Sequence, residues 1–148
     1  MDALELRDNA KQQLQEIRTI ETGVDYLNKI KAIATWAVAE KKDGVLQNMI
    51  AEQKLRTQRI LGELLRVSDL MSRKKESSSL SDYGLNVKQS HEFQKIASLP
   101  KETFEKEIET AKEETNKRIE LTTSRMLKVA KQYELAPVEI VFHVVPGI

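Results

Sequence analysis

The side chains best suited to contacting nucleic acid lie in one short stretch, directly after Asn86. They are Lys88, Gln89, His91 and Lys95. Glutamine and lysine pair with base edges and with phosphates, so these residues form a candidate DNA-binding surface if they share one face of a helix. We expect the first three near base edges and Lys95 on phosphate. Glu92 opposes binding, because a carboxylate near phosphates lowers affinity unless it accepts from a cytosine amino group.

A second basic group lies upstream, in the run Arg73, Lys74 and Lys75. An arm in that position could follow the DNA backbone or enter a minor groove. The formal net charge of the whole 148-residue chain is only +1. Any attraction to nucleic acid must therefore come from a local basic patch.

The elements that would present these side chains form a helix-turn-helix between Leu80 and Pro100. A short helix runs into Gly84, which supplies the permissive backbone of a tight turn, and a second helix ends at Leu99-Pro100. In this motif the first helix braces the second, and the second can lie in a DNA major groove. The alternative is a structural corner, since many all-α proteins contain a glycine between two short helices.

Capping-box spacings mark where both helices begin. Ser79 stands three residues before Asp82, and Asn86 stands three residues before Gln89. In each pair the side chain of the earlier residue can accept from the backbone N–H of the later one. The side chain of the later residue can in turn accept from the backbone N–H of the earlier one. Farther upstream, Thr22 is the expected N-cap of an amino-terminal helix.

The same segment resembles the helix-turn-helix of the ParB and KorB partition proteins over the residues GLNVKQSHEFQKIASLP. In that family a turn glycine, a recognition helix and a leucine-proline pair follow one another at the spacing seen here. The likeness continues downstream through FEKEIETAKEE and LTTSRMLKVAK. The resemblance implies a DNA-binding module. The family's nuclease, CTP-binding and partner-binding parts have no counterpart here.

A closer resemblance is to a group of largely uncharacterised phage and mobile-element helical proteins. It extends from about Gln58 to Lys131 and includes a helix end of the type LGELL, a polar linker and a helix of the type LTTSRML. Some members carry or adjoin a DNA methyltransferase domain, and that activity is not carried over to this chain. One departure from the ParB-like pattern is Ser90, where a branched apolar residue usually packs against the brace. The depth of that helix–helix contact is therefore left open.

The composition favours an all-α fold, because 32% of the residues are charged and only 5% are aromatic. We expect residues 1–70 to form a long-helix bundle or coiled coil that mediates association. Residues 71–79 form a basic flexible linker, and residues 80–135 form the helical region that contains the helix-turn-helix. Residues 136–148 form an extended tail with a short β-strand, predicted from the alternating, β-branched run VEIVFHVV.

Two features of the amino-terminal helices bear on partners. Trp36 lies off the centre of its helix's apolar stripe, where it can pack against a neighbour or sit at a partner surface. The helix expected from Gly44 to Val67 has apolar ends and a polar middle, from Glu52 to Arg59. That middle is either a solvated midsection or a surface that leaves its own bundle to contact something else.

The remaining residues argue against catalysis and bound cofactors. There is no cysteine, which excludes disulfides and thiolate metal sites, and His91 and His143 have no carboxylate at ligand spacing. Phosphate-binding glycine loops and hydrolase-type serine motifs are absent from the sequence. The amino terminus is too polar for a signal peptide, and no apolar run reaches membrane-spanning length. We therefore expect a cytoplasmic protein with no enzymatic activity, no metal, no cofactor and no membrane contact.

Two functions from different classes fit the sequence. The first is a small DNA-binding protein of phage or mobile-element type that binds double-stranded DNA through its helix-turn-helix. Its amino-terminal helices would self-associate, giving a dimer whose two motifs read paired half-sites. The alternative is a phage-encoded helical adaptor or inhibitor that binds a host protein complex, for example a defence or transcription complex, with the same fold as scaffold.

Overall fold

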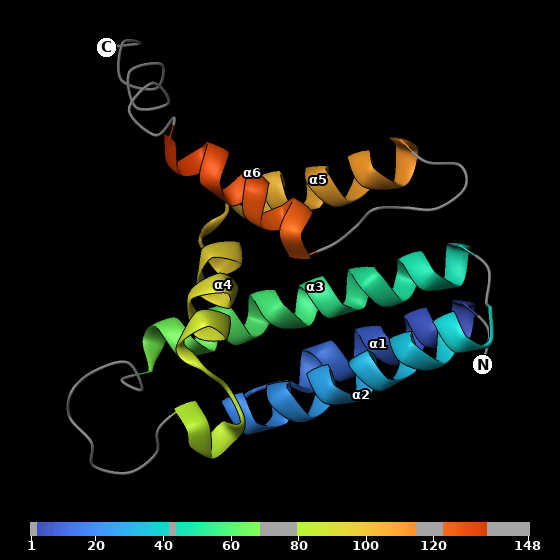
Figure 1. Ribbon diagram of the computed structural model, residues 1–148, viewed down its shortest axis with the longest axis horizontal. Helices are drawn as coiled ribbons and strands as arrows, with labels where there is room; N and C mark the ends of the chain where they lie inside the picture. The colour runs from blue at the N-terminus through green and yellow to red at the C-terminus, as the bar shows by residue number, and fades with distance from the viewer. Residues whose placement is uncertain (1–2, 42–43, 69–79, 115–122, 136–148) are drawn as a thin grey trace.

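The computed structural model describes residues 3–41, 44–68, 80–114 and 123–135 (Figure 1). These residues form α-helices and one turn of 3-10 helix, with no strand among them, so the described part of the chain is all-α as predicted. The elements are α1 (Ala3–Glu16), α2 (Ile20–Ala39), α3 (Gly44–Val67), η1 (Leu80–Tyr83), α4 (Val87–Ser98), α5 (Lys101–Glu114) and α6 (Thr123–Leu135). The predicted tail strand and the Arg73–Lys75 run lie outside the described residues.

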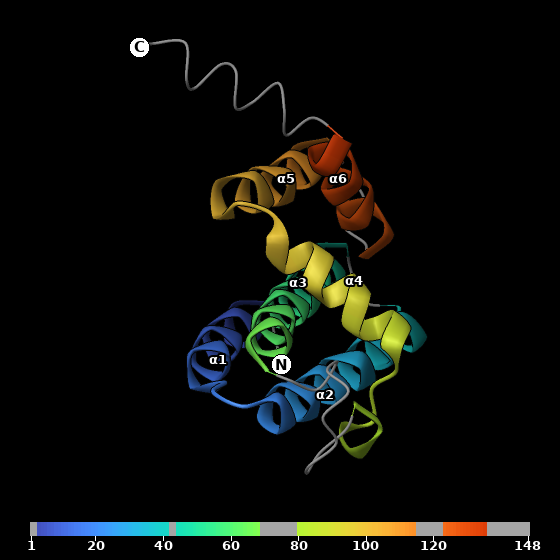
Figure 2. The ribbon, with the colours of Figure 1, turned by 90° about the vertical axis from the view of Figure 1, so that its left-hand side faces the viewer.

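Helices α1, α2 and α3 run alongside one another, and α3 contacts both α1 and α2 (Figures 1 and 2). Leu14 of α1 packs against a cluster of buried residues from α2, α3 and the α1–α2 connection: Ile17, Tyr26, Ile30, Ala37, Leu46 and Ile50. The predicted N-cap at Thr22 is wrong. The cap of α2 is Thr19, whose side chain accepts a hydrogen bond from the backbone N–H of Thr22 at 3.1 Å, so the helix begins one turn earlier.

Helix α4 crosses the carboxy-terminal half of α3 and connects the first three helices to the rest of the chain (Figure 2). Ser90 is fully buried, and Phe93 is buried beside it. Gly62 allows this approach, because a side chain there would collide with the backbone of Phe93. The contact that the sequence left open at Ser90 is therefore close.

The short first helix of the predicted motif is a single 3-10 turn, η1, which contacts α2. Its Leu80, together with Leu85 of the turn, joins a cluster with residues of α2, α3 and α4. Because α4 packs far more extensively on α3 than on η1, the main brace of the second helix is α3. A span of four residues gives η1 too little surface to support a longer helix alone.

Helices α5 and α6 lie on the opposite side of α3 from α1 and α2 (Figure 1). They enclose a third cluster of buried residues: Leu55, Ile96, Leu99, Phe104, Ile108, Ala111, Met126 and Ala130. The buried face of α5 includes Phe104, Ile108 and Ala111, and the buried face of α6 includes Met126 and Ala130. None of the helices that the structure describes is long and apolar enough to cross a membrane.

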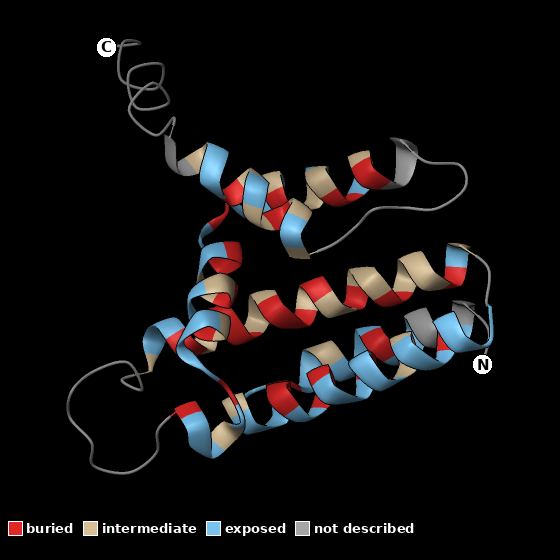
Figure 3. Cartoon of the chain, in the orientation of Figure 1, coloured by how far each residue is buried: buried red, intermediate tan, exposed pale blue. Residues whose placement is uncertain are grey.

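The polar middle of α3 is not solvated, so that interpretation is wrong. Gln53, Thr57 and Gln58 are buried, and Figure 3 shows buried and half-buried residues along most of α3. Thr57 satisfies its hydroxyl by donating to the carbonyl of Gln53 at 2.7 Å. Gln58 accepts from the Thr123 hydroxyl at 3.1 Å. The surface that the polar middle contacts includes the carboxy-terminal helices of the same chain.

Candidate nucleic-acid interface

The turn before α4 fixes where that helix begins. Gly84 has a backbone φ of 77°, a left-handed conformation that glycine adopts without strain. The side chain of Asn86 accepts from the Gln89 N–H at 2.8 Å, and Gln89 Oε1 accepts from the Asn86 N–H at 3.0 Å. The predicted capping box at this position is therefore confirmed.

Three of the predicted contact residues, Lys88, His91 and Lys95, are exposed on the outer face of α4. Gln89 is only half-buried, but its carbonyl oxygen is engaged by the helix cap. The second lone pair of that oxygen and the NH₂ group remain for a ligand, so a bidentate contact to adenine would have to use the side-chain orientation that the cap fixes. Gln89 therefore contributes first to positioning α4.

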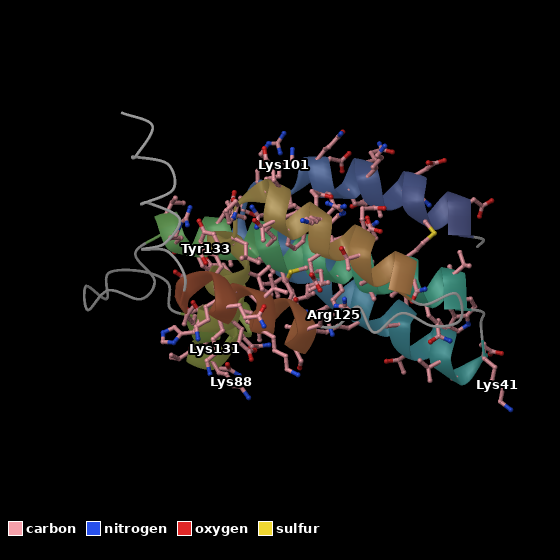
Figure 4. The ribbon with its side chains drawn as sticks, turned by 90° about the horizontal axis from the view of Figure 1, so that it is seen from above. Lys41, Lys88, Lys101, Arg125, Lys131 and Tyr133 are labelled. Carbon is pink, nitrogen blue, oxygen red and sulfur yellow. The ribbon has the colours of Figure 1, made fainter. Side chains whose placement is uncertain are left out.

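The outer face of α4 forms one wall of a groove, and α6 forms the other wall. The groove has a volume of about 660 Å³. Its lining residues are Val87, Lys88, His91, Glu92, Lys95, Ser124, Leu127, Lys128 and Lys131. We call this the α4–α6 groove. Figure 4 shows Lys88 and Lys131 on the same side of the molecule, well away from Lys41 and Lys101.

The charge of the groove is strongly positive. Four lysines line it, and Glu92 is the one carboxylate among the described lining residues. A neighbouring hollow of about 320 Å³ shares His91 and Lys95 with the groove and adds Arg66 from α3. The basic surface therefore continues from α6 across α4 to the end of α3. Such a surface attracts a polyanion, with an energy that falls as salt rises.

Lys128, Lys131 and Arg66 were missed in the sequence. They lie on α6 and α3, far along the chain from the predicted motif. A signal is present for the first two, because Met126 and Ala130 lie four residues apart on the buried face of α6, and residues 128 and 131 point away from that face. What the sequence does not reveal is that α6 lies beside α4.

The carboxy-terminal end of α4 is held by Arg59 of α3. Its guanidinium donates to the carbonyl of Ile96 at 2.9 Å and to that of Leu99 at 2.8 Å. It also lies 4.8 Å from the centre of the Phe104 ring, a cation–π distance. Helix ends leave carbonyls without intrahelical partners, so these bonds fix both the end of α4 and its angle across α3.

A second arginine ties α3 to α5. Arg56 donates to both carboxylate oxygens of Glu105, at 2.6 and 2.7 Å, and to Glu52 of its own helix at 2.9 Å. The hydrogen bonds from Arg56 lower the pKa of the Glu105 carboxyl. Two-point pairing of this kind fixes orientation as well as distance. It therefore holds α5 in register on α3, and α5 in turn supports α6.

No group of three or more His, Cys, Asp and Glu side chains within the described residues is arranged to hold a metal ion. Comparison of the chain with models of protein families, with curated proteins and with solved structures gave no match. The geometry of the α4–α6 groove is therefore the basis for the function proposed below.

Proposed function

We propose that this protein is a small DNA-binding protein of phage or mobile-element type that acts in the cytoplasm. The α4–α6 groove and the adjoining Arg66 contact the phosphate backbone of double-stranded DNA. The observation that carries the proposal is the gathering of four lysines and a histidine from α4 and α6 around one groove, against a single described carboxylate. Clustered lysines of this kind supply the sequence-independent part of DNA affinity.

The groove also indicates which side chains would hold the protein on the DNA backbone and which would contact base edges. Lys128 and Lys131 lie on α6, which forms the wall beside α4. They are not on the helix expected to enter the major groove, so they are suited to phosphates. His91 and Lys95 line both the groove and the neighbouring hollow, so they occupy the ridge between them. We assign base-edge contacts to His91 and Lys88, with Lys95 on phosphate. The ParB-like spacing of the sequence supports the same assignment.

Lysine footprinting tests this proposal on the protein without any substitution. The chain is acetylated briefly with and without a mixed-sequence duplex, and each lysine is quantified by mass spectrometry. We expect Lys88, Lys95, Lys128 and Lys131 to be protected by DNA. Lys41 and Lys101, which Figure 4 places away from the groove, are the internal controls. Uniform labelling of all lysines in saturating DNA would reject the proposal.

Self-association through the amino-terminal helices belongs to the same proposal. Trp36, near the end of α2, is 41% exposed, and Val45, near the start of α3, is 65% exposed. Apolar side chains left at the surface beside the α2–α3 turn are suited to a second copy of the chain. Trp36 is the one tryptophan of the sequence, so its emission should shift to the blue as protein concentration rises.

The same apolar residues favour the second candidate function, a helical adaptor that binds a host protein complex. In that case α4 and α6 would serve as scaffold, and DNA would leave lysine labelling unchanged. A Val45→Lys variant distinguishes the two roles proposed for the surface around Trp36 and Val45, self-association and binding of a host protein. We expect it to weaken self-association while leaving DNA binding by the single chain intact, whereas an adaptor would lose its partner.

A further inference from the structure

A separate hollow of about 220 Å³ lies between α2 and α3, with Thr123 of α6 at its edge. Its walls are largely apolar and include Ala34, Val38, Ile50, Ala51 and Leu55. It shares no lining residue with the α4–α6 groove. The volume suits a compact molecule, because a closed apolar cavity of about 150 Å³ is enough to hold a benzene ring.

Lys54 is the one charged side chain among the described residues that line this hollow. It is half-buried, and within the described residues no hydrogen bond or ion pair holds its ammonium group. Burial lowers the pKa of Lys54, and the nearby charge of Lys31 lowers it further. The hollow therefore presents a poorly solvated cation beside an apolar wall, with a second cation close to it.

We propose that this hollow binds a small carboxylate with a compact apolar body, such as an aromatic acid, with the carboxylate on the Lys54 ammonium. An anion there would offset both unfavourable effects on Lys54, the loss of water and the repulsion from Lys31. The apolar body would cover the side chains of Val38, Ala51 and Leu55. A neutral molecule of the same shape would gain only the apolar contact with the walls of the hollow. This site is independent of the proposed DNA-binding function.

Benzoate and benzamide are the probes, because they share size and shape and differ in charge. Backbone amide shifts of the full-length, isotope-labelled protein are followed during each titration. We expect benzoate to saturate the shifts of residues around the hollow with a dissociation constant in the millimolar range, roughly as its few non-hydrogen atoms allow. Benzamide should bind about tenfold more weakly, since its neutral carbonyl can accept a hydrogen bond from Lys54 but cannot form an ion pair with it.

Two variants locate the site. Lys54→Met keeps the apolar stem and removes the ammonium, so benzoate should bind it no better than benzamide. Ala51→Leu fills the hollow and should weaken both probes. Lys29→Met, at an exposed position of α2 that does not line the hollow, is the matched control and should bind as the unmodified chain does. Circular dichroism confirms that each variant is folded before its titration.

Three results would overturn the inference. They are shifts that do not saturate with benzoate, equal affinities for benzoate and benzamide, and a folded Lys54→Met variant that still prefers benzoate. If Lys54→Met proves unfolded, Lys54→Gln takes its place, since glutamine keeps a polar end without the charge.

Discussion

Gly62 of α3 and Phe93 of α4 lie in direct backbone contact where the two helices cross. A Cβ atom added to Gly62 would lie 2.8 Å from the Cβ of Ala97 and closer still to the carbonyl group of Phe93. Because the obstacle is backbone, it cannot rotate away as a side chain would. This contact sets the distance between α3 and α4, and so the position of the basic face of α4.

Gly62→Ala should therefore destabilise the fold although alanine favours helix. Overpacking costs about 1–3 kcal/mol, and the gain in helix propensity returns at most about 1 kcal/mol. We expect a net loss of about 1–2 kcal/mol in the free energy of unfolding, measured by urea denaturation. Gly23→Ala is the matched control, because the nearest atoms to its Cβ belong to side chains rather than backbone, the closest being Leu61 Cδ2 at 2.6 Å. Equal effects of the two substitutions would show that the crossing is not close.

Arg59→Met should loosen the carboxy-terminal end of α4. The substitution keeps an apolar stem but removes the donors to Ile96 and Leu99. The Ile96 carbonyl keeps the Leu99 N–H at 3.3 Å, whereas the Leu99 carbonyl must find another partner. We expect a loss of about 1–3 kcal/mol and faster amide hydrogen exchange in the last turn of α4. Arg66→Met, at an exposed position of the same helix, should change stability by less than about 0.5 kcal/mol. Unchanged exchange in the Arg59 variant would contradict the assigned role.

The Arg56–Glu105 pair should make stability depend on acid pH. The folded pKa of Glu105 is lowered below its ordinary value of 4.5. Its contribution to the free energy of unfolding is therefore fully present above pH 4.5. It is lost as pH falls below 4.5 and through the lower folded pKa. Glu105→Gln should therefore be less stable than the unmodified chain at neutral pH, and the difference should shrink in acid.

A double-mutant cycle assigns that dependence to the pair. In an Arg56→Met background, Glu105→Gln should have a much smaller effect at any pH, because the largest cause of the lowered pKa is gone. Urea denaturation at neutral pH and at about pH 3 supplies the four free energies at each pH. A difference between Glu105→Gln and the unmodified chain that stays constant across this range would exclude the proposed linkage.

Local pattern was sufficient to predict much of the fold. Capping-box spacing predicted the start of α4 at Asn86, and the four-residue spacing of Phe104 and Ile108 in the sequence matches their shared buried face, because both signals lie within a few residues. Hydropathy misread the middle of α3, since a polar residue such as Thr57 is buried at little cost when it bonds a carbonyl one turn away.

The candidate site was only half predictable for a related reason. Lys88, His91 and Lys95 share one face of one helix, and their periodicity is visible in the sequence. Lys128 and Lys131 join them only because α6 packs beside α4, a contact between residues far apart in the chain. That arrangement depends on the crossing at Gly62 and on the carboxy-terminal hold of Arg59, and neither has a local sequence signal.

The salt dependence of DNA affinity tests the role of the α4–α6 groove most directly. Fluorescence anisotropy with one mixed-sequence duplex, repeated over a series of salt concentrations, gives the slope of log affinity against log salt. Each phosphate contact contributes about −0.9 to that slope. We expect Lys128→Gln/Lys131→Gln to weaken binding and to make the slope shallower by about two units, while Lys41→Gln/Lys101→Gln changes neither. Identical slopes and affinities for the two double variants would contradict the proposal that the side chains of the groove contact DNA.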